Sequence, residues 1–299
     1  VGGIGDVYNA FIPSLTLGCG SYGRNSVSGN VGALNLLNIK TVGRRRNNMQ
    51  WFKVPSKIYF ERDSIQYLKT MADVERVMII TDESMMKLGF TQRIIDQLEA
   101  RQNKVNYQIF HNVEPDPDIT TVRSGAEAMA QFQPDTIIAL GGGSVMDAAK
   151  VMWLFYEQPE VDFRDLVQKF LDIRKRAVKF PELGSKAKYV GIPTTSGTGS
   201  EVTPFAAISD KKNNMKYPLA DYSLLPTVAI VDPALVETVP DFVTADTGMD
   251  VLTHAIEAYV SVMANDFTDG LALQAIKIVF ENLEASVKYN DPEARERMH

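Results

Sequence analysis

Short apolar runs alternate along the middle of the chain with longer segments in which apolar residues recur every three or four positions. The runs have the length of strands, and the longer segments have the period of helices. Strands and helices in this alternation predict an α/β fold whose parallel sheet is covered on both faces. The expected strands are 77–81, 105–110, 136–140, 188–192 and 227–231, and the expected helices are a stretch that ends near residue 101, 119–132 and 145–156.

The two ends of the chain have different patterns. Residues 1–50 are rich in Gly, Ser and Asn, end near the basic run 44–46 and show little apolar periodicity. We interpret them as a linker and the tail of a preceding domain. After Pro240 the strand pattern stops and helical periodicity continues, including residues 269–289. We therefore expect an α/β domain at 51–240, followed by the first part of an all-α domain at 241–299.

Charge, hydropathy and cysteine content narrow the class of protein. A net charge of -6 over 299 residues argues against nucleic acid or an anionic membrane as the partner. No apolar run has membrane-spanning length, and the first residues lack the order of a signal peptide. The single cysteine, Cys19, excludes an internal disulfide and fits a reducing cytoplasm. Because the sequence starts with Val rather than Met, we expect it to be part of a longer protein.

A glycine-rich loop follows the expected strand at 136–140. It consists of Gly141, Gly142, Gly143 and Ser144, and a helix follows directly. Glycines let the backbone turn tightly and approach a ligand, and the free N–H groups of a helix N-terminus suit a phosphate. The loop matches neither GxGxxG nor a Walker loop, and the alternative is a tight strand-to-helix turn. Its place at the carboxyl end of a parallel strand favours phosphate binding.

A second polar loop, 193–201, follows the expected strand at 188–192. Its hydroxyl groups include those of Thr194, Thr195 and Thr198, and they are suited to contact a pyrophosphate or a ribose. The alternative is a solvated loop that caps a helix beginning near residue 200. A second such loop at the carboxyl end of a strand makes the first one more credible as a binding site.

Two charged residues add to this candidate site. Asp82 ends the strand at 77–81, where a carboxylate can bind the adenosine ribose and repel a 2′-phosphate. Its alternative role is to cap the helix that follows. Lys216 could neutralise a phosphate, although a lone lysine in a polar loop is usually only solvated.

Asp250 and His254 lie four residues apart in a segment with clear helical periodicity. Residues at this spacing share one face of a helix, so a carboxylate and an imidazole there can bind one divalent ion together. The alternative is a hydrogen-bonding pair on the helix surface.

Three segments resemble signature motifs of the iron-dependent (group III) alcohol dehydrogenase family. They are 141–150 (GGGSVMDAAK), 193–203 (PTTSGTGSEVT) and 248–257 (GMDVLTHAIE), and they occur in the order of the family. The resemblance covers most of 51–299. It implies a dehydroquinate synthase-like architecture, in which a parallel-sheet dinucleotide-binding domain precedes an all-α metal-binding domain.

The resemblance also implies cofactors and their ligands. NAD and Fe(II) are the expected cofactors, with zinc as an alternative metal. The residues implied for the dinucleotide are Asp82, Asp116, Gly142, Gly143, Ser144, Asp147, Thr194, Thr195, Thr198 and Lys216. Asp250 and His254 match the first two metal ligands, whereas the two remaining histidine ligands of the family belong to a helical stretch beyond His299. With three histidines in all, the chain is expected to hold half a metal site and to have little activity alone.

Further segments resemble the bifunctional aldehyde–alcohol dehydrogenases. Residues 1–46 are similar to the end of the aldehyde dehydrogenase half and the linker, and 172–176 and 216–222 are also typical of the fused enzymes. Cys19 does not match the catalytic cysteine of the aldehyde half, so no aldehyde oxidation is expected from this chain. The resemblance implies NADH-dependent reduction of acetaldehyde to ethanol by a cytoplasmic homo-oligomer that forms filaments when intact.

Two other functions remain open at this point. A glycerol dehydrogenase or a dehydroquinate synthase-like enzyme has the same architecture and would use zinc. A piece of a filament that binds NAD without catalysis is the alternative of a different class. The spacing of Asp250 and His254 and the loop at 194–198 favour the alcohol dehydrogenase.

Overall fold

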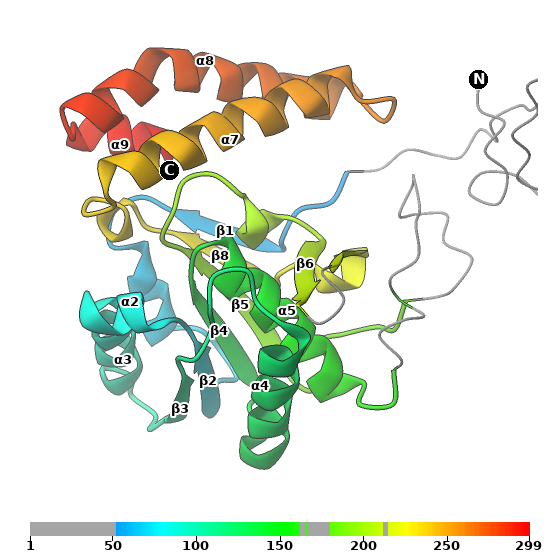
Figure 1. Cartoon of the computed structure of the whole chain (residues 1–299). Helices are drawn as coiled ribbons and strands as arrows, with labels where there is room; N and C mark the ends of the chain where they lie inside the picture. The colour runs from blue at the N-terminus through cyan, green and yellow to red at the C-terminus, as the bar shows by residue number, and fades with distance from the viewer. Residues whose placement is uncertain (1–51, 162–165, 167–179, 212–214) are drawn as a thin grey trace, which may run out of the picture. The chain divides into compact units, whose positions relative to one another are not determined.

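The computed structural model describes residues 52–161, 166, 180–211 and 215–299. In this part of the chain six strands form one sheet in the order β1-β8-β5-β4-β2-β3, and every neighbouring pair is parallel (Figure 1). Each expected strand agrees with an observed one to within one residue at either end, and the predicted α/β fold is confirmed. The strands are β1 (Lys57–Phe60), β2 (Arg76–Ile80), β3 (Asn106–Phe110), β4 (Thr136–Gly141), β5 (Lys188–Pro193) and β8 (Val228–Val231).

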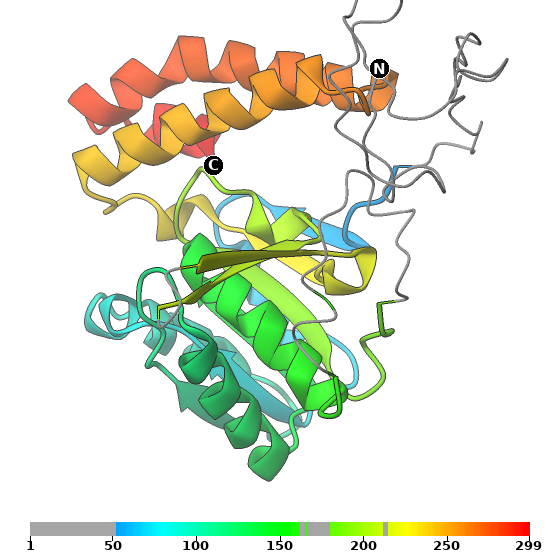
Figure 2. The same cartoon turned by 45° about the vertical axis from the view of Figure 1, so that its right-hand side comes forward.

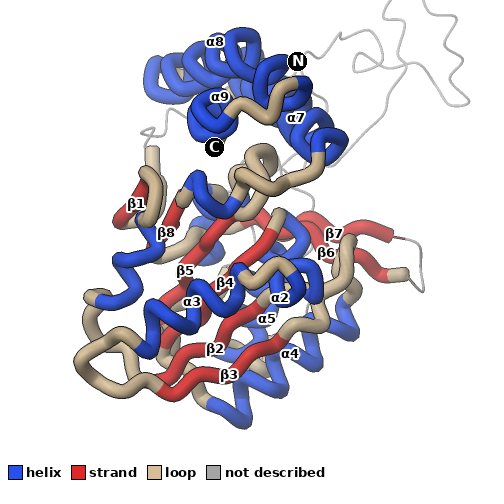
Figure 3. The backbone as a smooth tube through the Cα atoms, turned by 90° about the vertical axis from the view of Figure 1, so that its left-hand side faces the viewer, coloured by secondary structure: helices blue, strands red, loops and turns tan. Residues whose placement is uncertain are grey.

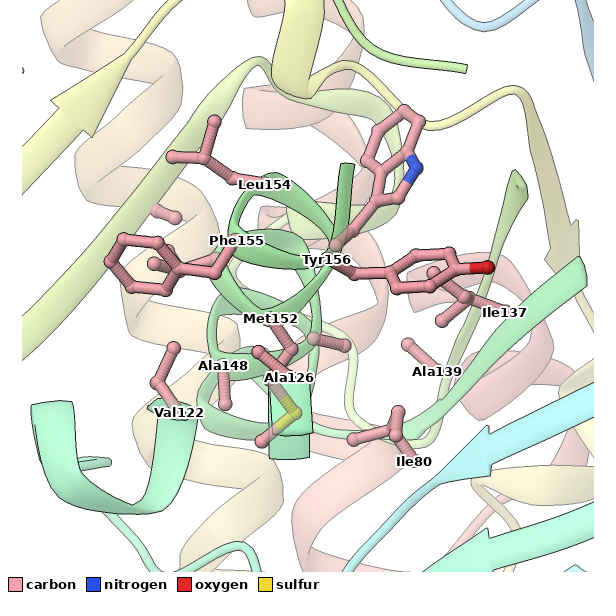
Figure 4. Packing of buried hydrophobic residues seen from close by; sticks show 14 of the residues in the cluster. Ile80, Val122, Ala126, Ile137, Ala139, Ala148, Met152, Leu154, Phe155 and Tyr156 are labelled. Carbon is pink, nitrogen blue, oxygen red and sulfur yellow. The ribbon is translucent and has the colours of Figure 1, made fainter. Parts of the chain in front are cut away.

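Helices cover both faces of the sheet because successive side chains of a strand point to opposite sides. Ile137 belongs to the core packed against α4 (Ile119–Phe132) and α5 (Gly143–Glu157), which Figure 4 shows together with Met152. Its neighbour Ile138 belongs to a second core. That core is closed by α3 (Phe90–Glu99) and the 3₁₀ helix η2 (Ser64–Lys69).

The helical stretch expected to end near residue 101 is two helices. The short α2 (Glu83–Lys87) is separated from α3 by Gly89, whose φ of 76° is a left-handed conformation that glycine adopts without steric cost. The stretch therefore bends where the sequence pattern suggested a continuous helix.

An antiparallel hairpin, β6 (Phe205–Asp210) with β7 (Met215–Ala220), was not expected from the sequence. Pro218 lies within β7, and proline usually argues against a strand, although an edge position tolerates it. The 3₁₀ helix η4 (Ser200–Val202) precedes the hairpin and η5 (Tyr222–Leu224) follows it. A further 3₁₀ helix, η6 (Pro233–Leu235), follows β8.

The chain ends in three helices among the described residues, α7 (Asp241–Val260), α8 (Asp266–Lys288) and α9 (Pro292–Met298). The helices α7 and α8 lie side by side (Figure 1 and Figure 2). They pack so closely that a Cβ added to Gly248 of α7 would lie 2.2 Å from a methyl carbon of Leu283 of α8. Within the described ranges, no helix is long and apolar enough to cross a membrane. The helix α7 begins at the expected boundary, and the division into domains stays a prediction. The predicted linker at 1–50 lies outside the described residues.

A buried arginine ties α9 to the segment that leads into α7. The Arg295 guanidinium donates hydrogen bonds to the carbonyl groups of Val236, Glu237 and Val239 at 2.8–3.1 Å and, through Nε, to that of Ser286 at 3.3 Å. Val236 and Ser286 are buried and Glu237 and Val239 are partly buried, so the guanidinium satisfies carbonyl groups that have limited access to water. It thereby holds α9 against the segment that leads into α7.

We predict that Arg295→Ala lowers the free energy of unfolding by about 3 kcal/mol, because it leaves buried carbonyl groups without donors. Arg297→Ala is the matched control, since Arg297 lies exposed on the same helix. Urea unfolding followed by circular dichroism measures both. Equal stability of the two variants would contradict the role assigned to Arg295.

Candidate dinucleotide and metal site

Two polar loops leave the sheet at the same edge because β4 and β5 are parallel neighbours. Gly141 of β4 is in register with Pro193 of β5, and the Thr194 N–H donates to the Gly141 carbonyl at 3.1 Å. The glycine loop and the threonine loop therefore start side by side. In Figure 3 the helices α7 and α9 lie over this end of the sheet. The threonine loop contacts α7 and His299, the residue that follows α9.

The three glycines of the first loop have different surroundings. A Cβ on Gly141 would meet the Val145 side chain at 2.6 Å, and one on Gly143 would meet Thr198 Cγ2 at 2.7 Å. A Cβ on Gly142 has Thr195 Oγ1 as its nearest neighbour at 3.4 Å, which is an ordinary contact. Packing within the protein thus requires glycine at 141 and 143. At Gly142 there is room on the side that faces the threonine loop.

Gly142 is also the N-cap of α5 and provides no side-chain cap for this helix. The first N–H groups of a helix have no partners within the helix, and the dipole places partial positive charge there. The N-terminus of α5, between two polar loops, is the arrangement that binds phosphate in many nucleotide-binding sheets. The predicted contacts of Gly142, Gly143 and Ser144 with a dinucleotide stay predictions.

One buried lysine on α5 fastens the threonine loop and the hairpin. The Lys150 ammonium is fully buried and donates to the carbonyl oxygens of Ser200, Thr203 and Phe205 and to Ser200 Oγ at 2.7–2.9 Å. Burial lowers the pKa of Lys150 to about 8, and nearby Asp147 opposes this shift. No role for Lys150 was expected from the sequence, although a lysine inside the apolar helix 145–156 is a signal that it has buried partners.

The Asp147 carboxylate is already in use by the protein. One oxygen accepts from Ser200 Oγ at 2.8 Å, and the other accepts from the Ala207 N–H at 2.9 Å. Burial raises the pKa of Asp147, whereas Lys150 and these hydrogen bonds lower it. The side chain therefore holds the base of the hairpin and the end of the threonine loop. The contact with a dinucleotide that the resemblance implied for it stays a prediction.

The structure brings Asp116, Ser144 and Lys216 together from three elements. The Asp116 N–H donates to Ser144 Oγ at 3.3 Å, and its carboxylate lies 3.0 Å from the Lys216 ammonium. Asp116 has a φ of 56°, a left-handed conformation that Asp and Asn tolerate better than most residues. The hairpin thus carries Lys216 to Asp116, whose N–H is bonded to the first turn of α5.

Asp82 caps a helix, as one of the two interpretations of the sequence proposed. Its Oδ1 accepts hydrogen bonds from the N–H groups of Ser84 at 2.7 Å and Met85 at 3.0 Å. It follows β2, whose Thr81 side chain donates to the Leu140 carbonyl on neighbouring β4. Capping leaves the second carboxylate oxygen for another partner, and the contact with a ribose stays a prediction.

Asp250 and His254 lie on one face of α7, as their spacing predicts. Asp250 Oδ1 is 3.6 Å from His254 Nε2, and both side chains are about half exposed. Among the described residues no group of three or more His, Cys, Asp or Glu side chains is placed to hold a metal ion. A carboxylate oxygen and an imidazole nitrogen are donors that suit Fe(II) and also zinc. Both the metal site and the surface pair remain compatible with this geometry.

The threonine loop touches the helix that carries this pair. A Cβ added to Gly197 would lie 2.7 Å from Thr247 Cβ and 2.9 Å from the Thr247 carbonyl oxygen, so the two backbones are in direct contact. Thr247 is three residues before Asp250 on α7. Beside this contact, Ser196 Oγ lies 3.0 Å from His299 Nδ1, and burial lowers the pKa of His299 to about 4. These positions of Gly197 and His299 were not expected from the sequence.

Comparison with known families identifies the class of protein. Residues 55–233 match the family of iron-containing alcohol dehydrogenases, and residues 244–299 match the C-terminal part of Fe-containing alcohol dehydrogenases. The chain belongs to the iron-containing alcohol dehydrogenase family.

Three similar proteins show which members of this family the chain resembles. An aldehyde-alcohol dehydrogenase of Streptococcus pneumoniae is 79% identical over the whole chain, which spans 34% of that protein. The structure of an iron-containing alcohol dehydrogenase from Thermococcus thioreducens matches with a TM-score of 0.75 at 33% identity, covering 83% of this chain and 64% of that one. A sulfoacetaldehyde reductase from Bifidobacterium kashiwanohense, solved with NAD+, matches with a TM-score of 0.73 at 31% identity, covering 84% and 64%. These likenesses confirm the resemblance and the dehydroquinate synthase-like fold expected from the sequence.

The room beside Gly142 generates a sharp prediction. Gly142→Ala should lower the affinity for NADH at least about tenfold, a loss on the order of 1.4 kcal/mol, because the methyl group takes the place where a phosphate would approach. The fold should lose no more than about 1 kcal/mol, the cost of alanine at an N-cap.

Gly270→Ala is the control for this prediction, since a Cβ at that position on α8 would meet no described atom within 4 Å apart from its chain neighbours and the backbone of its own helix. NADH fluorescence titration measures the affinity, and thermal unfolding checks the fold. Unchanged NADH affinity in a folded Gly142→Ala variant would show that the loop is only a turn.

Proposed function

We propose that this chain binds NAD(H) and Fe(II) and takes part in the interconversion of an aldehyde and an alcohol, with acetaldehyde and ethanol as the substrate pair. The observation that carries the proposal is the contact between the two candidate halves of the site, the polar loops at the sheet and the helix α7. Two polar loops flank an uncapped helix N-terminus, and one of them touches the helix that bears Asp250 and His254. Membership of the iron-containing alcohol dehydrogenase family supports the same chemistry.

The residues of the chain would divide the work between two ligands. When bound, the iron supplies Lewis-acid polarisation of the carbonyl oxygen and the dinucleotide supplies the hydride. Gly142, Ser144 and the threonine hydroxyl groups would bind the pyrophosphate, and Asp82 would orient the adenosine ribose. Asp250 and His254 would hold the metal. The backbone contact between Gly197 and Thr247 would fix the distance between these two sets of residues.

The proposal includes the larger protein in which this activity takes place. The 79% identical relative is an aldehyde-alcohol dehydrogenase about three times as long as this chain, which supports a role within such a bifunctional enzyme. We propose a cytoplasmic homo-oligomer, filamentous when intact, with small aldehydes and alcohols as its partners. NADH-dependent reduction of acetaldehyde with added Fe(II), measured on the protein that contains this chain, separates this enzyme from a scaffold that only binds NAD.

Asp82 should make the site prefer NAD(H) over NADP(H). Its charge would repel the 2′-phosphate by on the order of 1 kcal/mol, which is about a fivefold difference in affinity. Asp82→Asn should remove most of this preference while the helix α2 stays capped, because Asn and Asp cap equally well. Calorimetric titration with both cofactors measures the preference.

Asp82→Ala is the companion variant. It should remove the same preference and also lower the stability by about 1 kcal/mol through loss of the cap. Equal affinity of the unmodified chain for NADH and NADPH would overturn the role of Asp82 in specificity.

The 299-residue chain studied alone should bind Fe(II) weakly and reduce acetaldehyde slowly. Two protein ligands leave a divalent ion largely hydrated, whereas catalytic sites of this kind use about three or more. His254→Ala should remove the remaining binding, and His111→Ala, in an exposed loop, should leave it unchanged. Anaerobic calorimetry with Fe(II) measures both variants. Tight binding that survives His254→Ala would place the metal elsewhere.

A further inference from the structure

Two exposed ion pairs fasten the β6–β7 hairpin to the turn before α4. Lys211 pairs with Glu114 at 2.9 Å and Lys216 pairs with Asp116 at 3.0 Å. The backbone adds a hydrogen bond from the Ser209 N–H to the Pro117 carbonyl at 3.0 Å. The two pairs have the same charges, nearly the same length and similar exposure, so each can serve as a control for the other.

Only the second pair has a described contact with the glycine loop. Through its N–H, Asp116 is bonded to Ser144 in the first turn of α5, whereas no such bond links Glu114 to that turn among the described residues. The hydrogen bonds from Lys216 and Ser209 hold the pKa of the Asp116 carboxyl below its usual range, so the group is charged at neutral pH. A carboxylate is therefore fixed at the edge of the place where the helix N-terminus favours an anion.

The ammonium of Lys216 has Asp116 as its partner in the structure, and a bound dinucleotide would bring a second anion to the neighbouring turn of α5. We propose that Asp116 competes with the pyrophosphate of the dinucleotide for Lys216 and thereby lowers the affinity of this site for NADH. The inference rests on the proposed function, because it requires the dinucleotide to bind at the glycine loop.

Asp116→Asn tests the competition directly. Asn tolerates the same left-handed backbone and nearly the same volume, so the variant removes the charge and keeps the turn. Freed from its ion pair, Lys216 should raise the affinity for NADH about two- to fivefold, the range expected for an exposed ion pair. Glu114→Gln removes an equal charge from the matched pair and should leave the affinity within the error of the titration.

A double-mutant cycle assigns the gain to Lys216. Lys216→Met should weaken NADH binding, and Asp116→Asn should bring no further gain in that background. Adenosine has no phosphate, so its affinity should be the same for the unmodified chain and Asp116→Asn. High salt should reduce the gain, since it screens exposed charges.

The outcomes are separable. If NADH binds the unmodified chain and Asp116→Asn does not strengthen it, or Glu114→Gln strengthens it equally, the competition is wrong and the proposed function stands. Weaker binding by Asp116→Asn would mean that the carboxylate itself holds the cofactor, which also overturns the inference. Failure of the unmodified chain to bind NADH would overturn the inference and the proposed function together.

Discussion

The buried ammonium of Lys150 is the interaction on which the rest of the site depends. Removing a charge from water is costly, and the cost is offset only when the charge is fully hydrogen-bonded and paired. Here the oxygens of Ser200, Thr203 and Phe205 surround it, and Asp147 lies one turn earlier on the same helix. The loop between β5 and β6 must follow α5 closely to supply these oxygens. The position of the threonine loop and the start of the hairpin are consequences of that requirement.

Much of the fold could be predicted from the sequence, because the central strands are buried on both faces. Strands such as 136–140 are continuous apolar runs, and the helix 119–132 agrees with α4 at both ends. The hairpin could not be predicted, because Pro218 interrupts its pattern and β7 is half exposed. A helix or strand can thus be predicted when its burial imposes a regular pattern of apolar residues on the sequence. The hairpin is less visible in the sequence, because only part of it, including Ala206, Ile208 and Leu219, joins the core, while other residues of both strands are exposed.

The candidate site could be predicted in its location but not in its internal contacts. The glycine and threonine loops were identifiable because each follows a buried strand. That both oxygens of Asp147 bond to Ser200 and Ala207 could not be predicted, since these partners lie more than 50 residues away and belong partly to the unexpected hairpin. The surroundings of Gly142 and Gly143 likewise depend on the threonine loop, whereas Gly141 meets Val145 in the helix that follows it. One sequence motif therefore contains residues that serve the protein interior and residues that remain free for a ligand.

The contact between Gly197 and Thr247 has a consequence for how the site tolerates change. Most packed elements meet through side chains, which can shift between rotamers and absorb a small displacement. At Gly197 and Thr247 the two backbones are in contact, so no flexible side chain separates the threonine loop from α7. A displacement of either element is passed to the other nearly undiminished, and well-oriented reactions lose rate with errors of about 1 Å. A larger side chain at Gly197 would therefore displace the loop and the helix together.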